Sequence, residues 1–320
     1  MRVCTIDIGT NSVRALVADV DEAGGIRVLH REGLITRLGE GLSESGLLDG
    51  AAVQRTARAV NKIVTKARRL RADRFKIVAT SAARNARNSQ ALKDRIRNLT
   101  SLKTEIISGM QEARYVCEGA LNSLEVGANQ VLVADIGGGS TELIFARRGE
   151  EPTLTSAGTG AVFLTERFIR HDPPLEEELS AALKEASAAL QKAVNAFPSG
   201  AEELIGLGGT ITTVPPILME MEKYDASRVH NYLIMLEEME SVLSRLASMP
   251  LAERKTVKGL EPGRADIIVA GLVILKALLR VTRFKSIRVS DQGILFGLAL
   301  SVVQRDVNEG PKTDRADLTE

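Results

Sequence analysis

Hydrophobic runs and amphipathic stretches alternate along the first part of the chain. Apolar, β-branched runs that end at glycine or polar residues predict strands at residues 3–9, 12–20, 24–34, 75–82 and 103–108. A helix is expected from about Asp49, its predicted N-cap, because apolar residues recur every three or four positions as far as Ala67. The same criteria predict helices at 89–99, with Ser89 as the cap, and at 109–121.

This order of patterns starts again after a polar, aperiodic segment at residues 123–130. Strands are expected at residues 131–137, 140–147, 151–158, 203–210 and 286–291. Helices are expected at residues 174–197, 235–249, 264–281 and 293–305. The repeat predicts two related α/β domains, one formed by residues 1–124 and completed by a C-terminal helix at 300–320, the other by residues 125–299.

Two short stretches at matching places in this repeat have nearly the same sequence, DIGTNSVR from Asp7 and DIGGGSTE from Asp135. The copies match at an aspartate, a glycine and a serine: Asp7 and Asp135, Gly9 and Gly137, Ser12 and Ser140. Each stretch joins two predicted strands, so it forms a hairpin turn. Such a turn offers backbone N–H groups and hydroxyls without bulky side chains, and it can wrap closely around a phosphate.

The aspartate before each turn adds a carboxylate at the end of a buried strand. Asp7 and Asp135 are therefore suited to hold a divalent ion, or its waters, beside phosphate oxygens. Two such hairpins facing each other across a cleft would hold a phosphate chain from both sides. A third glycine loop, GLGGT at 206–210, also follows a strand and opens a helix. The alternative interpretation is that each copy is only a tight turn.

Composition and charge exclude several classes of function. The chain has 320 residues, 44% of them hydrophobic, and a formal net charge of +1, so it lacks the basic excess of a general nucleic-acid-binding protein. The densest basic cluster, at residues 66–76, is interpreted as a solvated face. The two cysteines, Cys4 and Cys117, stand in apolar stretches and are expected to be buried, reduced thiols. The three histidines are scattered, which argues against a zinc site.

The two hairpins resemble those of the actin–Hsp70–sugar kinase superfamily. Within it, the chain resembles the short form of the exopolyphosphatase/guanosine pentaphosphate phosphohydrolase (Ppx/GppA) family. Five stretches carry the resemblance: DIGTNSVR at 7–14, ATSAARNARN at 79–88, IISGMQEAR at 106–114, DIGGGSTEL at 135–143 and GLGGT at 206–210. The resemblance implies an α/β fold of two ribonuclease H-like, actin-like domains with a cleft between them. It also implies a phosphoanhydride hydrolase.

The resemblance implies roles for individual residues. Glu112 would be the catalytic base, and Asp135 and Glu142 would place metal and water; metal binding is assigned to Asp7, Asp135 and Glu142. Phosphate binding is assigned to Thr10, Asn11, Ser12, Arg84, Gly137, Gly138, Gly139, Ser140, Thr141, Gly208, Gly209, Thr210 and Arg264. From the residues alone, the preferred interpretation of Glu112 is a first-turn helix carboxylate favoured by the helix dipole, and the resemblance reverses that preference. Arg84 and Glu142 could equally be exposed surface residues.

Two positions depart from the family pattern. Gln111 stands where the family often has the first of two adjacent glutamates, which would weaken any help that this residue gives to metal binding. Pro215 and Pro216 fall within the helix expected after GLGGT, and proline there should kink or delay it.

The resemblance favours release of terminal orthophosphate from linear inorganic polyphosphate. Hydrolysis of guanosine pentaphosphate, a non-catalytic sensor of either ligand, and a sugar or acid kinase of the same superfamily are the alternatives. Mg²⁺ or Mn²⁺ is the expected cofactor, with K⁺ as a further candidate. The start of the chain lacks a charged leader followed by an apolar run, and the apolar run at 267–275 is too short to span a bilayer. We therefore expect a cytoplasmic protein without nucleic-acid or membrane partners. The resemblance further implies a homodimer.

Overall fold

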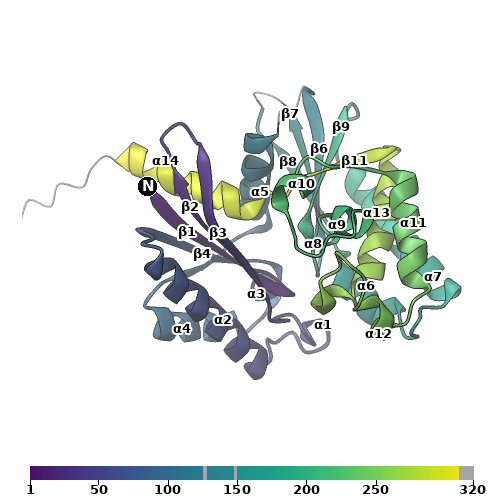
Figure 1. Cartoon of the computed structure of the whole chain (residues 1–320), viewed down its shortest axis with the longest axis horizontal. Helices are drawn as coiled ribbons and strands as arrows, with labels where there is room; N and C mark the ends of the chain where they lie inside the picture. The colour runs from purple at the N-terminus through teal and green to yellow at the C-terminus, as the bar shows by residue number, and fades with distance from the viewer. Residues whose placement is uncertain (125–127, 148–149, 310–320) are drawn as a thin grey trace, which may run out of the picture.

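The computed structural model describes residues 1–124, 128–147 and 150–309, which form two β-sheets and the helices around them (Figure 1). The strands of the first sheet are β1 (Arg2–Ile8), β2 (Ser12–Val20), β3 (Ile26–Ile35), β4 (Arg74–Ala79) and β5 (Thr104–Ile106). The strands of the second sheet are β6 (Gln130–Ile136), β7 (Thr141–Arg147), β8 (Thr153–Ala157), β9 (Glu203–Leu207), β10 (Leu233–Met235) and β11 (Ser286–Val289).

The helices divide between the two halves of the sequence. In the first half they are α1 (Leu42–Ser45), α2 (Gly50–Arg69), α3 (Ser81–Asn85), α4 (Ser89–Thr100) and α5 (Gly109–Ser123). In the second half they are α6 (Ala161–Phe168), α7 (Glu176–Val194), α8 (Gly208–Ile211), α9 (Val214–Leu218), α10 (Ala226–Val229), α11 (Leu236–Ala247), α12 (Leu251–Arg254), α13 (Ile268–Thr282) and α14 (Ile294–Glu309).

The two sheets repeat one topology. The first has the strand order β3-β2-β1-β4-β5, and the second contains the equivalent order β8-β7-β6-β9-β11 with β10 added at one edge. In both, the first three strands are antiparallel, and the next two are parallel to the first. The internal repeat inferred from the two similar stretches is therefore a repeat of the whole sheet.

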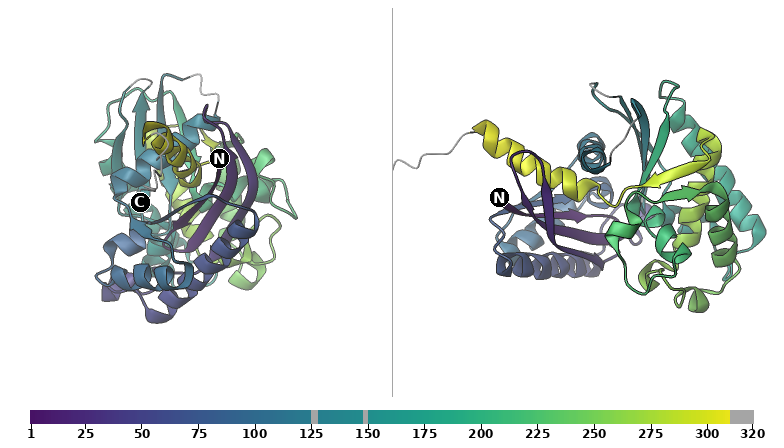
Figure 2. Two further views of the ribbon diagram at one scale, coloured as in Figure 1. Left: turned by 90° about the vertical axis from the view of Figure 1, so that its left-hand side faces the viewer. Right: turned by 45° about the horizontal axis from the view of Figure 1, so that its top comes forward.

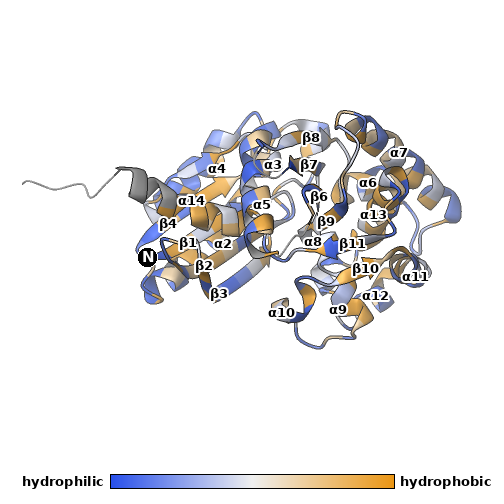
Figure 3. Cartoon of the chain, turned by 90° about the horizontal axis from the view of Figure 1, so that it is seen from above, coloured by the Kyte–Doolittle hydropathy of each residue, from blue (hydrophilic) through white to orange (hydrophobic). Residues whose placement is uncertain are grey.

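The helices and sheets stack in five layers. Alternate residues of β1 face opposite sides: Cys4 and Ile6 join a core with α2 and α4, whereas Val3 joins a core with α5 and α14. That second core also takes Val131 and Val133 from β6, so α5 and α14 lie between the two sheets (Figure 2). Helices α7 and α13 cover the outer face of the second sheet. Helix α13 is hydrophobic over most of its length (Figure 3), because it is buried on nearly all sides.

The C-terminal helix returns to the first sheet. Thr5 of β1 donates a hydrogen bond to the carbonyl of Leu295 at 3.0 Å, and Lys76 of β4 donates to Ser301 at 2.8 Å. The predicted helix at 300–320 overlaps α14, but its residues from 310 onward lie outside the described part of the chain. The predicted domain boundary at 124/125 borders residues 125–127, which also lie outside it, so the domain limits stay a prediction.

Several local predictions are confirmed and others are corrected. The side chain of Asp49 accepts a hydrogen bond from the Ala52 N–H, as an N-cap should. Ser89 is not a cap: it is the first residue of α4, and the preceding Asn88 bonds to the backbone of Leu48 instead. The two prolines divide the helix after GLGGT into α8 and α9, with Pro215 in the first turn of α9, as proline's fixed φ favours.

Other differences from the sequence-based expectations have local causes. The helix expected from residue 264 begins at Ile268, because Pro262–Arg264 forms a 3₁₀ turn before it. Helix α6 was not expected at all. Cys4 and Cys117 are buried and unpaired, as predicted. Among the described residues, no helix is long and apolar enough to cross a membrane.

Glycines let α5 and α14 approach closely. A Cβ at Gly297 would lie 1.9 Å from the carbonyl oxygen of Tyr115, and a Cβ at Gly119 would lie 2.1 Å from that of Gly293. Neither Cβ could be accommodated unless the two helices moved apart. This matters for the site described below, because α5 carries Glu112 at its N-terminal end.

We predict that Gly297→Ala destabilises the fold, because the added methyl group meets backbone rather than a movable side chain. The free energy of unfolding should fall by about 1–3 kcal/mol, measured by denaturant unfolding. Gly50→Ala is the matched control: a Cβ there meets no atom within 4 Å. Equal unfolding midpoints for the two variants would show that this helix contact is not tight.

Candidate active site

The two predicted phosphate turns are folded alike. In the first, the N–H of Gly9 donates to the carbonyl of Ser12 at 2.9 Å; in the second, the N–H of Gly137 donates to the carbonyl of Ser140 at 3.0 Å. Both turns join antiparallel strands in the same register. The sequence similarity thus reflects one backbone geometry used twice.

The two turns face each other. A Cβ built on Gly139 would lie 3.4 Å from the Thr10 hydroxyl oxygen and 3.3 Å from the Ser81 hydroxyl oxygen. One on Gly138 would lie 3.5 Å from Cβ of Thr10. Larger residues in the second turn would fill the gap, so the paired glycines keep it open.

A cavity of about 90 Å³ lies between the turns. Most of the predicted site residues line it: Asp7, Thr10, Asn11, Ser12, Glu112, Asp135, Gly137, Gly138, Gly139, Ser140, Glu142, Gly208, Gly209, Thr210 and Arg264. They come from the turns of both sheets, the N-terminal end of α5 and the third glycine loop. The structure therefore brings together residues that lie far apart in the sequence.

The third glycine loop borders the cavity through its backbone. Gly208 has a φ of 89°, and a Cβ there would lie 2.6 Å from a carboxylate oxygen of Asp135. The guanidinium of Arg264 lies over Gly209, where a Cβ would be only 1.5 Å from it. Thr210 is buried, with its side chain against Gly271 of α13.

Two predicted phosphate ligands do not line the cavity. Thr141 is fully buried, and its hydroxyl donates to the carbonyl of Thr159 at 2.7 Å, so it supports the turn from behind. Arg84 is engaged by protein groups: its guanidinium donates to Glu112 at 2.9 Å and to the carbonyl of Ile107 at 3.0 Å. As placed, Arg84 orients the predicted base rather than contacting the cavity.

Glu112 lies in the first turn of α5, and the residues before it fix the start of that helix. The Ser108 hydroxyl accepts from the N–H of Gln111 at 3.2 Å, and the Gln111 side chain accepts from the N–H of Ser108 at 3.0 Å. This reciprocal pair is a capping box. Gln111, the departure from the family pattern, therefore has a structural role that glutamine fills as well as glutamate.

Sequence reasoning missed Arg14, Thr80 and Ser81, which also line the cavity. Arg14 donates two hydrogen bonds to one carboxylate oxygen of Asp7, at 2.7 and 3.2 Å. It faces Asp7 across the first hairpin as Glu142 faces Asp135 across the second. Superposing the two copies would have shown that Arg14 and Glu142, which carry opposite charges, occupy equivalent positions.

Burial makes three of the carboxylates that line the cavity, those of Glu112, Asp135 and Glu142, hard to ionise. The pKa of Glu112 is raised to about 8, first by burial and then by the charges of Glu142 and Asp7, while Arg84 opposes the shift. Burial also raises the pKa of Asp135, with Arg14 opposing. The pKa of Glu142 is raised by burial too, although the hydroxyls of Ser140 and Ser156 donate to it at 2.6 and 3.2 Å.

The cation Arg14 is held by the same charges. Burial would lower the pKa of its guanidinium, but the carboxylates of Asp7, Asp135 and Glu112 raise it instead. Arg14 thus stays charged beside Glu112 and Asp135, whose own ionisation is unfavourable. The cavity can accept further positive charge.

The predicted metal ligands only partly fit a preformed site. Among the described residues, no three acidic, histidine or cysteine side chains form a cluster that could hold an ion. Asp7 is paired with Arg14, and Glu142 is bonded by serines, so Asp7, Asp135 and Glu142 do not make a three-ligand site. One oxygen of Asp7 is nevertheless buried without a hydrogen-bond partner. An ion bound through one or two carboxylates and a substrate phosphate, as Mg²⁺ often is, fits this arrangement.

A larger cavity of about 680 Å³ adjoins the site and shares Ser12, Arg14, Asp135, Gly208, Gly209 and Arg264 with it. Its walls include apolar side chains and four further acidic residues, Glu32, Glu222, Glu261 and Asp291. The cavity is therefore wider and less polar than the gap between the turns.

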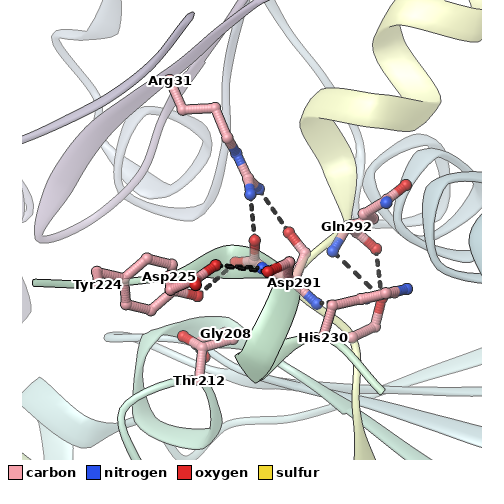
Figure 4. A network of polar contacts seen from close by, with 10 residues as sticks. Arg31, Gly208, Thr212, Tyr224, Asp225, His230, Asp291 and Gln292 are labelled. Carbon is pink, nitrogen blue, oxygen red and sulfur yellow. Dashed lines mark hydrogen bonds and ion pairs between the residues drawn. The ribbon is translucent and has the colours of Figure 1, made fainter. Parts of the chain in front are cut away.

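A polar network joins the two halves of the protein beside the large cavity (Figure 4). Arg31 of β3 pairs with the Asp291 carboxylate and donates to its carbonyl at 2.6 Å, and the Tyr224 hydroxyl donates to the same carboxylate at 2.7 Å. A second ion pair between the halves, Arg37 with Asp266, has a length of 2.7 Å.

Known proteins resemble the chain over nearly its whole length. "Exopolyphosphatase 2" of Mycobacterium tuberculosis is 34% identical over 94% of this chain and 98% of its own. A crystal structure of the Ppx/GppA family member of Aquifex aeolicus superposes with a TM-score of 0.81 at 31% identity, covering 96% of this chain and 98% of that one.

A more distant relative is named for a different activity. The guanosine-5'-triphosphate,3'-diphosphate pyrophosphatase of Pseudoalteromonas atlantica is 27% identical over 94% of this chain, which spans 59% of that protein. The model of the Ppx/GppA phosphatase family matches residues 16–306. The two actin-like domains, the paired hairpins and these matches agree: the chain belongs to the Ppx/GppA phosphatase family.

Proposed function

We propose that the protein is a phosphoanhydride hydrolase that releases terminal orthophosphate from linear inorganic polyphosphate. The observation that carries this proposal is the pair of facing glycine turns, with the half-buried Glu112 beside the gap between them. A relative at 34% identity bears the name exopolyphosphatase, which supports the choice of substrate.

The turns would bind the terminal phosphate. Backbone N–H groups at 10–12 and 138–140, with the hydroxyls of Thr10 and Ser12, offer donors without bulk. Arg264, beside Gly209, can neutralise charge on the next phosphate of the chain. Binding of this kind holds the phosphoryl group and stabilises the leaving phosphate at the same time.

Glu112 would orient the attacking water and take its proton. The water oxygen bonds to the terminal phosphorus, the bond from that phosphorus to the bridging oxygen breaks, and the shortened chain leaves with the electron pair. A raised pKa gives Glu112 the proton affinity that a general base needs near neutral pH. Arg84 fixes the direction of the carboxylate.

Asp7 and Asp135 would hold a divalent cation, Mg²⁺ or Mn²⁺. When bound, the cation would neutralise phosphate charge and lower the ionisation cost of the neighbouring carboxylates. A role for K⁺, a homodimer and a cytoplasmic location also stay predictions.

Guanosine pentaphosphate is the second candidate substrate, and the large cavity favours it. That cavity continues from the site and offers apolar walls to an uncharged group. A relative at 27% identity bears the corresponding name. A nucleoside attached to the phosphates would fit this space.

The first prediction concerns the base. Glu112→Gln should lower phosphate release from tripolyphosphate, long-chain polyphosphate or guanosine pentaphosphate by about 100-fold or more, the scale of a lost general base, while substrate binding persists. Gln111→Glu, at the adjacent capping position, is the control and should keep activity. Full activity of Glu112→Gln on every substrate would rule out the assigned role.

The second prediction is a pH signature in the chelated, metal-free protein. The folded pKa of Glu112, about 8, lies above the ordinary value of 4.5, so the folded state retains more protons between these limits and stability falls as pH rises. Glu112→Gln removes this effect. Relative to wild type, the variant should gain about 1 kcal/mol or more between pH 5 and pH 9, measured by denaturant unfolding at each pH. If the difference in unfolding free energy between the variant and wild type did not change with pH, the pKa of Glu112 would not be raised in the folded protein.

The third prediction separates the candidate substrates. Gly33 lines the large cavity, and a Cβ there meets no atom within 4 Å. Gly33→Leu should therefore occupy the cavity without straining the strand. It should raise KM for guanosine pentaphosphate by about 10-fold, the effect of roughly 1.4 kcal/mol, and leave KM for tripolyphosphate unchanged. Gly33→Ala is the control. Unchanged kinetics with the nucleotide would place its nucleoside elsewhere.

A further inference from the structure

Positive charge is concentrated in one segment of a nearly neutral chain. Residues 50–104 contain fifteen lysines and arginines but only two acidic residues, Asp73 and Asp94, a net charge of +13 in a chain whose total is +1. The rest of the protein is correspondingly acidic. This segment forms α2, β4, α3 and α4.

The charge gathers on the outer surface of two helices. Helix α2 has no acidic residue, and five basic residues follow one another at helical spacing along it: Arg55, Arg58, Lys62, Lys66 and Arg69. All five are exposed. Helix α4, which packs beside α2, adds Lys93 and the exposed Arg97. We call these seven residues the basic face.

Few acidic groups neutralise the basic face. Lys62 and Lys66 share Glu32, and Arg55 pairs with Glu40. Within the described part of the chain, the other four members of the face, Arg58, Arg69, Lys93 and Arg97, form no ion pair with an acidic residue. Like charges at i,i+4 destabilise a helix. A multivalent anion bound across the face would relieve that repulsion.

The basic face begins near the active site. Strands β1 and β4 are parallel and end at Ile8 and Ala79, next to Gly9 and Ser81 at the cavity. Helices α2 and α4 start at this end of the sheet and run back along it to the far end, where β4 and β5 begin (Figures 1 and 2). A helix of 20 residues, the length of α2, is about 30 Å long. The face therefore leads away from the site.

We propose that the basic face binds the distal part of a long polyphosphate chain whose terminal phosphates lie between the two turns. This inference rests on the proposed function and assigns a second binding region to the same substrate. The small cavity has room for only the end of such a chain. The face supplies spaced cations for phosphates further along.

Composition favours polyphosphate over nucleic acid as the occupant. Proteins that bind single-stranded nucleic acid commonly stack bases on aromatic side chains. Residues 50–104 contain one aromatic residue, Phe75, which packs against the core of the first sheet. A surface of cations without exposed aromatic rings suits a polyanion without bases.

The test is a variant that removes three cations without an ion-pair partner, Arg58→Gln, Arg69→Gln and Arg97→Gln combined. Its dissociation constant for long-chain polyphosphate at low salt should rise about 10-fold or more, and the slope of log Kd against log salt should fall by about 2 to 3, as for lost phosphate contacts. Its kcat/KM for tripolyphosphate should match wild type, which also verifies the fold. Lys184→Gln, Lys192→Gln and Lys285→Gln combined is the matched control, because these exposed cations belong to the other half.

Unchanged affinity for long-chain polyphosphate in the triple variant would overturn the inference. So would a variant that loses affinity for polyuridylate while its affinity for long-chain polyphosphate stays the same, since the face would then be a nucleic-acid surface. A wild-type protein that binds long-chain polyphosphate through the face but hydrolyses none would support the binding region and contradict the proposed function. The two claims therefore fail separately.

Discussion

Desolvation, and after it the charge of neighbouring carboxylates, raises the pKa values of Glu112, Asp135 and Glu142, and the rest of the site depends on this cost of ionisation. Asp7, Glu112, Asp135 and Glu142 line one small cavity, and Arg14 is placed among them. Three of these carboxyls have raised pKa values, and one oxygen of Asp7 is buried without a partner. Such an arrangement is costly in an empty protein. A bound cation would relieve it, and the donors of the turns would then hold the phosphate.

The duplicated sheet is what places these groups together. Each half supplies one hairpin, and the equivalent positions 14 and 142 carry opposite charges in the two halves. The copies have therefore diverged in side chains while keeping one backbone. Helix α5 lies between the sheets, so Glu112 is fixed by a core to which both halves contribute. The base and the phosphate turns are held by the same packing.

Much of this could be predicted from the sequence, because glycine turns and strand ends are local signals. DIGTNSVR and DIGGGSTE identified both hairpins, and their repetition identified the repeated sheet. The residues that were missed, and those that lie outside the small cavity, depend on contacts across the fold. Arg84 turns toward Glu112, and Thr141 turns inward to Thr159, although Ser140 and Glu142 on either side of Thr141 line the cavity. The direction of a single side chain is set by its neighbours in space, which periodicity does not report.

The same limit applies to charge and to cavities. In the linear sequence, the cluster at residues 66–76 is interpreted as a solvated face. The full extent of the basic face becomes visible only when α2 and α4 lie side by side. The large cavity combines residues from both halves. Gln111 shows the opposite case: its spacing from Ser108 is a local capping signal that was readable in the sequence. Local motifs were thus recoverable, and surfaces built from several elements were not.

A crystal structure of the Glu112→Gln variant with tripolyphosphate and Mg²⁺ would test the central claim most directly. The account predicts the terminal phosphate between the turns at 9–12 and 137–140, with a water in hydrogen-bonding reach of residue 112 and in line with the bridging oxygen. It also predicts the cation between the phosphate and the carboxylates of Asp7 and Asp135. A terminal phosphate bound elsewhere, with the gap between the turns empty, would contradict it.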